Sequence, residues 1–342
     1  MIVIRTPDGL SLRLRPRALA VGTGCALLAL ALGVIAVGSG DYPLSPVDVL
    51  RVLTGGGDPA EHFIVTELRL PRVVTALCVG AALALAGAVF QSLIRNPLGS
   101  PDVLGFTQGA ATGALLVVVV GGSSLALGAA AVAGGLLTGV LVHALAWRRG
   151  VHGYRLILVG IGISAILTGV NGYLLTRAPL MDASRAVLWL TGSLDGRGWV
   201  NALPLLVALA VLVPTVFLAC GPALRMTELG DDAAAALGVP VQRLRLLLLG
   251  AAVLLVSLAA AAAGPVSFVA LTAPHLARRL TRAPGPNLLP AMAVGAVLLV
   301  AADQVAQRAV AGHQLPVGAL TGVLGGGYLI WLLATERRAG RL

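Results

Sequence analysis

Two arginines stand three residues apart at the start of a long apolar run, in the sequence Arg69-Leu70-Pro71-Arg72. The planar guanidinium group of arginine pairs with a carboxylate through two parallel hydrogen bonds, so this pair could bind an acidic partner surface. Proline suits the first turn of a helix, which places both arginines at a helix start. The same side chains could instead anchor the chain at a membrane interface, with their charged ends reaching water. The residues alone leave both interpretations open.

Other ionisable groups lie inside or at the ends of apolar runs. His275 follows Pro274 and precedes Arg278 by three residues. A histidine in such a run is usually a hydrogen-bonded packing residue, and metal binding or gating is less common. Asp303 lies near the end of another apolar run and therefore requires a partner, for which Arg308 or a neighbouring helix terminus is a candidate.

No catalytic or nucleotide-binding signature occurs in the chain. All 24 basic residues are arginine, so the lysine of a GxxxxGK[ST] phosphate loop is absent. The patterns HExxH, CxxC and GxSxG are absent too, and Cys25, Cys78 and Cys220 lie singly within apolar runs. The runs also lack closely spaced Cys, Asp, Glu or His that could hold a bare ferric ion. We therefore predict no enzymatic activity, no metal site and no cofactor bound by this chain.

A segment with turn-forming pairs closes the second long apolar run. It extends from Gln91 to Pro101 and contains Asn96-Pro97 and Ser100-Pro101. Proline pushes the residue before it out of helical geometry, so the helix should end here. A plain turn explains the prolines and the glycine but not the whole string.

A second polar segment, residues 221–243, separates two later runs. An alanine run follows Asp231 and Asp232, and Gly238 and Pro240 are helix breakers. This composition predicts short helices that lie outside the membrane. A solvated loop is the simplest interpretation.

The elements that position these residues are membrane helices. With 58% hydrophobic and 11% charged residues and a mean hydropathy of +0.95, the chain cannot hide its apolar side chains in one soluble core. A spanning helix needs about 20 mainly apolar residues. The expected spans are 18–38, 70–93, 104–120, 125–147, 155–176, 199–220, 244–263, 266–281, 288–306 and 315–334. We predict an all-α polytopic membrane protein with about ten transmembrane helices, in which residues 1–342 form a single transmembrane domain.

The arginines favour one orientation of these spans. If the spans alternate from a cytoplasmic N-terminus, 17 of the 24 arginines fall inside and 7 outside, as the positive-inside rule requires. Both termini are then cytoplasmic, and residues 221–243 are cytoplasmic too. The net charge of +10 therefore reflects orientation, and we predict no nucleic-acid partner.

Small residues recur at spacings that let helix backbones approach closely. The pairs are Gly109 and Gly113, Gly135 and Gly139, and Gly160 and Gly169. We expect them to pack helices together, with lining of a transport path as the alternative.

In their order and spacing, these motifs resemble the permease subunits of ATP-driven importers for iron-siderophores, haem and vitamin B12. The resemblance covers nearly the whole chain after about residue 60. It rests on RLPR (69–72), QSLIRNPLGSP (91–101), ELGDDAAAALGV (228–239), GPVSFVALTAPHLARR (264–279) and QLPVGALTG (314–322). One departure is GGGYLIWLL (325–333), where Gly327 stands in place of the family's usual proline and makes the helix entry more flexible.

The resemblance implies a type II ABC importer permease fold and assigns roles to particular residues. Those expected to dock a soluble or lipid-anchored substrate-binding protein are Arg69, Arg72 and Arg308. Those expected to couple the chain to ABC ATPase subunits, which use the ATP, are Glu228, Leu237 and Gly238 in segment 221–243. Those expected along the transport path or its gate are Gln91, Asn96, Pro97, Pro274 and His275.

It also implies a homodimer, or a pair with a paralogous permease, in the bacterial cytoplasmic (inner) membrane. A ferric siderophore is the expected cargo, and cobalamin and haem stay open because the binding protein recognises such large chelates. An ion-coupled secondary transporter is the alternative from another class. It predicts acidic residues at mid-span and inverted repeats, and this sequence has almost none of the former.

Overall fold

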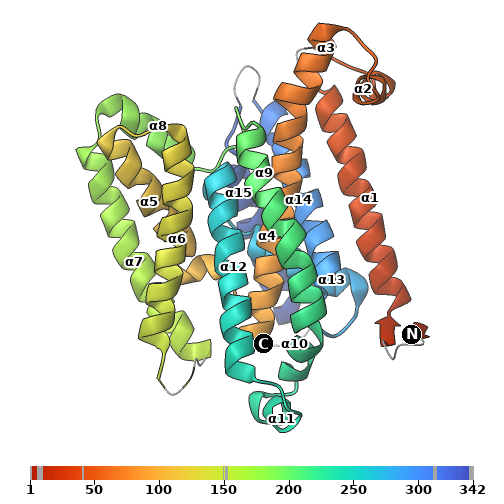
Figure 1. Cartoon of the computed structure of the whole chain (residues 1–342), viewed down its shortest axis with the longest axis vertical. Coiled ribbons are helices and arrows are strands. Elements are labelled where there is room, and N and C mark those ends of the chain that lie inside the picture. Colours follow the sequence, from red (N-terminus) through yellow and green to blue (C-terminus); the bar gives the residue numbers. More distant parts are fainter. Residues whose placement is uncertain are drawn as a thin grey trace.

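Apolar helices run roughly side by side through most of the computed structural model, which describes residues 2–5, 11–40, 42–148, 150, 153–310 and 314–338 (Figure 1). The long helices are α1 (Pro16–Gly38), α4 (Leu70–Ile94), α5 (Phe106–Val120), α6 (Ser124–Ala146), α7 (Gly153–Arg177), α9 (Trp199–Pro214), α12 (Val241–Ala263), α13 (Val269–Thr281), α14 (Leu288–Arg308) and α15 (Val317–Arg338). Strands β1 (Ile2–Arg5) and β2 (Ser11–Leu14) pair antiparallel before α1.

Short helices mark the two ends of the bundle. One end, here called the α3 end, carries α2 (Pro46–Leu53), α3 (Pro59–Phe63) and α8 (Leu180–Leu190). The opposite end, here called the α11 end, carries α10 (Gly221–Thr227) and α11 (Asp231–Ala236). The prediction of short helices within residues 221–243 is therefore confirmed.

Eight of the described helices are long and apolar enough to cross a membrane. Each corresponds to a predicted span. The other two predicted spans, 104–120 and 266–281, are longer than the helices found there. Helix α5 has 15 residues and helix α13 has 13. Helices of that length fall short of the roughly 20 residues needed to cross, so the count of ten is approximate. Much of α13 is buried within the protein, where a partial helix at membrane depth can be tolerated.

Two predicted spans continue beyond their expected ends. Residues 59–94 form one helical stretch, in which α3 and a π-helical turn (Ile64–Arg69) lead directly into α4. Residues 199–227 likewise join α9 to α10 through a π-helical turn (Thr215–Cys220). Both extensions carry polar residues, which is why hydropathy alone ends the spans too early.

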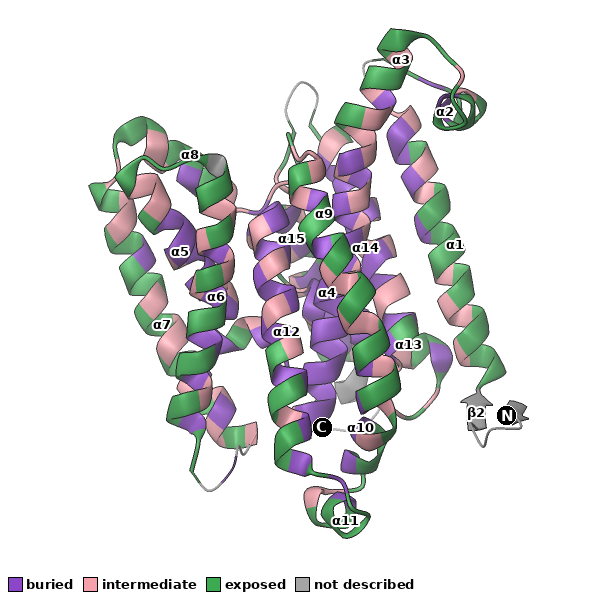
Figure 2. Cartoon of the chain, in the orientation of Figure 1, coloured by how far each residue is buried: buried purple, intermediate pink, exposed green. Residues whose placement is uncertain are grey.

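Helix α4 lies at the centre of the protein (Figure 2). In the most apolar stretch of α4, 83% of the residues are buried. The corresponding fraction is 17% for α7 and 28% for α15. Helices α12, α13 and α14 pack around α4, while less than a third of the most apolar stretch of α1, α6, α7 and α15 is buried. Those outer helices must therefore be covered by lipid or by another membrane subunit.

Glycines allow the closest helix contacts. A Cβ atom on Gly80 of α4 would collide with the backbone of Gly295 in α14, and one on Gly113 of α5 with the backbone of Ala130 in α6. The predicted packing role is confirmed at Gly109, Gly113, Gly135, Gly139 and Gly160, each of which faces another element at such short range. At Gly169 a Cβ atom would meet no other described residue, so this glycine packs against no helix of the described chain.

Candidate functional site

An ion pair between Arg72 and Asp303 joins α4 to α14 at the α3 end. The guanidinium group donates from Nη2 to Asp303 Oδ1 at 2.9 Å and from Nε to Oδ2 at 3.1 Å, so the pair is bidentate. The side chains are 15% and 5% exposed. Gln307, one turn along α14, donates to the same carboxylate at 2.7 Å. Arg72, in the first turn of α4, is thus the partner that Asp303 requires. Of the two predicted candidates, Arg308 is wrong, and the terminus of a neighbouring helix supplies the partner.

The remaining contacts of Arg72 reach two loops. Its Nη1 donates to Gln314 Oε1 at 2.9 Å and lies 3.5 Å from the exposed carboxylate of Asp195. Asp195 belongs to the loop after α8, and Gln314 precedes α15. One guanidinium group therefore connects four segments that are distant in sequence.

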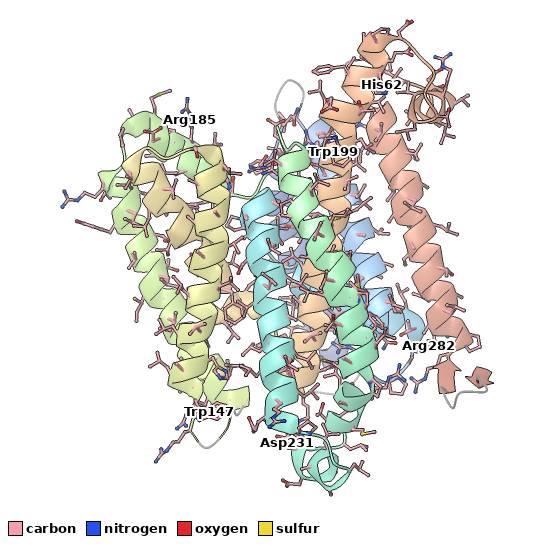
Figure 3. The ribbon with its side chains drawn as sticks, in the orientation of Figure 1. His62, Trp147, Arg185, Trp199, Asp231 and Arg282 are labelled. Carbon is pink, nitrogen blue, oxygen red and sulfur yellow. The ribbon has the colours of Figure 1, made fainter. Side chains whose placement is uncertain are left out.

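Arg69 is held by backbone groups. It donates to the carbonyls of Val37 at 3.0 Å and Tyr42 at 2.8 Å, and so ties the end of α1 to the start of α4. Arg308, by contrast, is exposed in the last turn of α14. The structure brings all three predicted docking arginines to the α3 end, but only Arg308 presents an exposed side chain there. Trp199 lies at the same end and donates to the carbonyl of Thr66 at 2.9 Å (Figure 3).

The predicted path residues divide into two groups. Gln91 is buried in α4 and contacts α13 twice, because Nε2 donates to the Leu271 carbonyl and Oε1 accepts from Arg278. His275 of α13 forms a hydrogen bond through Nδ1 with Tyr328 of α15 at 2.5 Å. Pro274 is buried beside it in α13. This first group therefore links three helices through polar contacts.

The second group, Asn96 and Pro97, is exposed where α4 ends. Arg95 takes a left-handed conformation, and the Asn96 amide donates to the Gln91 carbonyl, as in a Schellman cap. Asn96 Oδ1 accepts from the Leu98 amide at 2.9 Å, which completes a side-chain turn. The predicted turn is confirmed, and the backbone hydrogen bond of the cap is the link between Asn96 and Gln91 of the first group.

The predicted coupling residues lie around α11. Leu237 is 61% exposed just after this helix, and Leu229 is exposed just before it. Gly238 has φ +84°, a left-handed backbone conformation that glycine adopts without strain. Glu228 follows α10, and partial burial raises the pKa of its carboxyl group, which the nearby arginines Arg225, Arg278 and Arg15 counteract. Apolar side chains thus stand exposed on a small helical projection.

Asp231, the first residue of α11, holds this projection to the bundle (Figure 3). Its carboxylate accepts two hydrogen bonds from Arg245 of α12, at 2.8 and 3.0 Å, and lies 3.8 Å from Arg95 at the end of α4. Sequence reasoning missed this contact and the Arg72–Asp303 pair, because both join residues from separate elements. The available signal was an acidic residue at a helix end, which requires a partner.

A bundle of apolar helices of this kind, with a buried central helix and a short helical projection at one end, defines a polytopic membrane protein. Residues 27–335 match the model of the FecCD transport family. The chain belongs to this family.

Relatives of known role support the assignment over most of the chain. The ferric enterobactin transport system permease protein FepG of Escherichia coli (strain K12) is 46% identical over 314 residues, which cover 90% of this chain and 93% of FepG. The vitamin B12 import system permease protein BtuC of Salmonella schwarzengrund (strain CVM19633) is 35% identical over 282 residues, 81% of this chain and 85% of BtuC.

A solved structure shares the fold. It is an inward-facing conformation of a metal-chelate type ABC transporter, with a TM-score of 0.80 and 31% identity, and the match covers 93% of this chain and 99% of that one. The predicted fold, that of a type II ABC importer permease, is therefore confirmed. The chain is a multi-pass permease subunit of this family, which favours the predicted importer over the alternative of an ion-coupled carrier.

Proposed function

We propose that this chain carries an intact ferric siderophore across the bacterial cytoplasmic membrane as the membrane subunit of an ATP-driven importer. The observation that supports a ferric siderophore as cargo is the 46% identity with the ferric enterobactin permease over 90% of the chain. The identity with the vitamin B12 permease is lower, at 35%. A chelated ferric ion needs no protein ligands, because the siderophore already fills its coordination sphere.

In this proposal the α11 end faces the cytoplasm and receives an ABC ATPase subunit. Exposed apolar side chains on a short helix suit docking into a groove of a partner protein, and Leu229 and Leu237 provide them. Asp231 passes the motion of α11 to α4 and α12, because its carboxylate contacts arginines on both helices. Each step of ATP binding or hydrolysis then shifts the populations of two membrane conformations.

The α3 end faces outward and receives the substrate-binding protein. Arg308 offers an exposed positive charge to an acidic surface of that protein. Arg69 and Arg72 make their main contacts within the chain, so they act there chiefly by shaping this surface. A second permease, identical or paralogous, covers part of the exposed apolar surface of the outer helices, and lipid covers the rest.

Deletion of the gene tests the cargo. The deletion strain should lose growth on one ferric siderophore as sole iron source and regain it when the gene is restored on a plasmid. Retained siderophore growth together with a specific loss of cobalamin or haem uptake would refute the cargo and leave the family assignment intact.

A further inference from the structure

Helix α2 has an apolar face that no part of the described chain covers. Val47, Leu50 and Leu53 follow one another at three-residue steps and are 73%, 55% and 45% exposed. Val49 and Val52 form a second face and are buried against α1 and the start of the α4 stretch. Residues three and four apart share one side of a helix, so Leu53 adjoins Val49 and the exposed apolar side chains continue from the buried ones. The set of Val47, Leu50 and Leu53 is called the α2 apolar face below.

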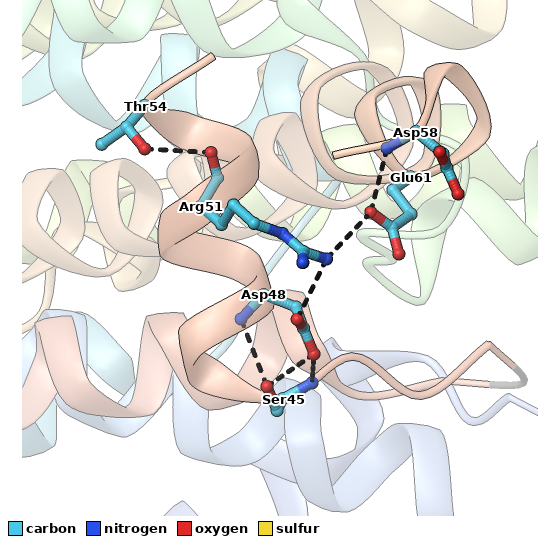
Figure 4. Close-up of polar contacts among 6 residues, drawn as sticks. All are labelled: Ser45, Asp48, Arg51, Thr54, Asp58 and Glu61. Atoms are coloured by element: carbon cyan, nitrogen blue, oxygen red, sulfur yellow. Dashed lines mark hydrogen bonds and ion pairs between the residues drawn. The ribbon is translucent and has the colours of Figure 1, made fainter. Parts of the chain in front are cut away.

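The charged side chains of α2 form its third face and are used to hold the helix in place (Figure 4). Asp48 accepts from the amide and hydroxyl of Ser45, at 3.2 and 2.6 Å, in a capping box. Arg51 lies 3.1 Å from Asp48 and 3.5 Å from Glu61 of α3. The charges are therefore drawn toward α3 and away from the α2 apolar face.

The position of α2 matches the boundary of a bilayer. Figure 1 shows α2 end-on, so its axis crosses the direction of the long helices. It lies next to the end of α1, where Val49 packs close to Gly38. Along α1, Leu27, Leu30 and Ile35 are exposed, as expected for a spanning helix in contact with lipid. The α2 apolar face thus lies beside the end of a helix whose exposed side chains are apolar.

We propose that α2 is an interfacial helix whose α2 apolar face inserts into the lipid at the α3 end of the protein. A helix with separate charged and apolar faces that lies across the bilayer normal buries its apolar face about 5–10 Å into the boundary between headgroups and acyl chains. The occupant is lipid and not a soluble partner, because the face adjoins a spanning helix and its charges point elsewhere. The insertion anchors the loop between α1 and α4, and it therefore fixes the depth of Arg69 relative to the bilayer.

Spin labels in lipid vesicles test this inference. Cys25, Cys78 and Cys220 are first replaced by alanine, and Leu50→Cys, Leu53→Cys and the control Ala60→Cys each receive a nitroxide. Ala60 is exposed on α3, at the same end of the protein. The full chain is reconstituted in phosphatidylcholine vesicles, and collision of each label with oxygen, which dissolves in lipid, is compared with collision with a water-soluble nickel chelate. Complementation of the deletion strain verifies that each cysteine variant folds.

Labels at Leu50 and Leu53 should collide more with oxygen than with the chelate, and the label at Ala60 should show the reverse. The proposal is wrong if the labels at Leu50 and Leu53 behave like the label at Ala60. It is also wrong if they become shielded from the chelate only when the substrate-binding protein is added, since the face would then be a protein-docking surface.

Discussion

Arg72 and Asp303, the side chains that hold α4 to α14 at the α3 end, lie 231 residues apart in the chain. Removing one member of a buried ion pair leaves the other unpaired and costs about 3–5 kcal/mol. We therefore expect Asp303→Asn to lower the melting temperature of the protein in detergent. Arg308→Gln, which changes an exposed arginine at the same end, is the control and should melt like the parent.

A double-mutant cycle tests whether Arg72 and Asp303 stabilise the fold as a pair. The sum of the stability losses of Arg72→Gln and Asp303→Asn should exceed the loss in the double variant. The reason is that the second substitution removes a charge that the first left unpaired. Simple additivity would show that the two side chains do not act as a pair.

Glu228 provides a prediction about pH. Partial burial raises the pKa of Glu228 above its ordinary value of 4.5, so the folded chain binds this proton more tightly than the unfolded chain does. Ionised Glu228 therefore weakens the folded state at neutral pH, and the penalty disappears as the pH falls through the raised pKa toward the ordinary value. Glu228→Gln should melt at or slightly above the parent temperature at pH 7, with no advantage at pH about 4. A lower melting temperature of this variant at pH 7 would contradict the argument.

At the scale of the helix, α11 is expected to act through Asp231. Hydrogen bonds to charged groups contribute about 1.5–3 kcal/mol, and partial exposure of Asp231 reduces this figure. If the substitution weakens the attachment of α11 by about 1 kcal/mol, the ratio of attached to detached α11 falls roughly five-fold. Asp231→Asn should therefore lower substrate uptake per ATP hydrolysed in reconstituted vesicles. The matched control is Asp232→Asn, an exposed neighbour. Equal coupling in the two variants would show that Asp231 has no such role.

Hydropathy predicted the long helices well, because a run of about 20 apolar residues has few alternatives in a membrane. It failed at α13, where the length of an apolar run includes the non-helical residues 265–268, and at the start of the α4 stretch, where a helix continues into polar sequence. The positions of Arg69, Arg72 and Arg308 at one end followed from the order of the spans. Their contacts did not, since Asp303 meets Arg72 only after α4 and α14 pack through Gly80 and Gly295.

At the scale of the whole molecule, the apolar outer helices and the two polar ends describe one subunit of a larger assembly. Eight spans give the membrane body, α11 projects at one end, and Arg69, Arg72 and Arg308 lie at the other. Family membership assigns this body to transport. We expect partner chains to supply the energy, the substrate capture and part of the path. ATP-driven uptake of an intact ferric siderophore therefore has to be measured on the assembled complex.

That measurement is uptake of a doubly labelled ferric siderophore into vesicles that contain this permease, its ATPase and its binding protein. The iron carries one isotope and the siderophore another. We expect both labels to enter in equal amounts, only with ATP and the binding protein, and free ferric ion to stay outside. Entry of iron without its siderophore, or entry of both labels without ATP, would contradict the proposed function.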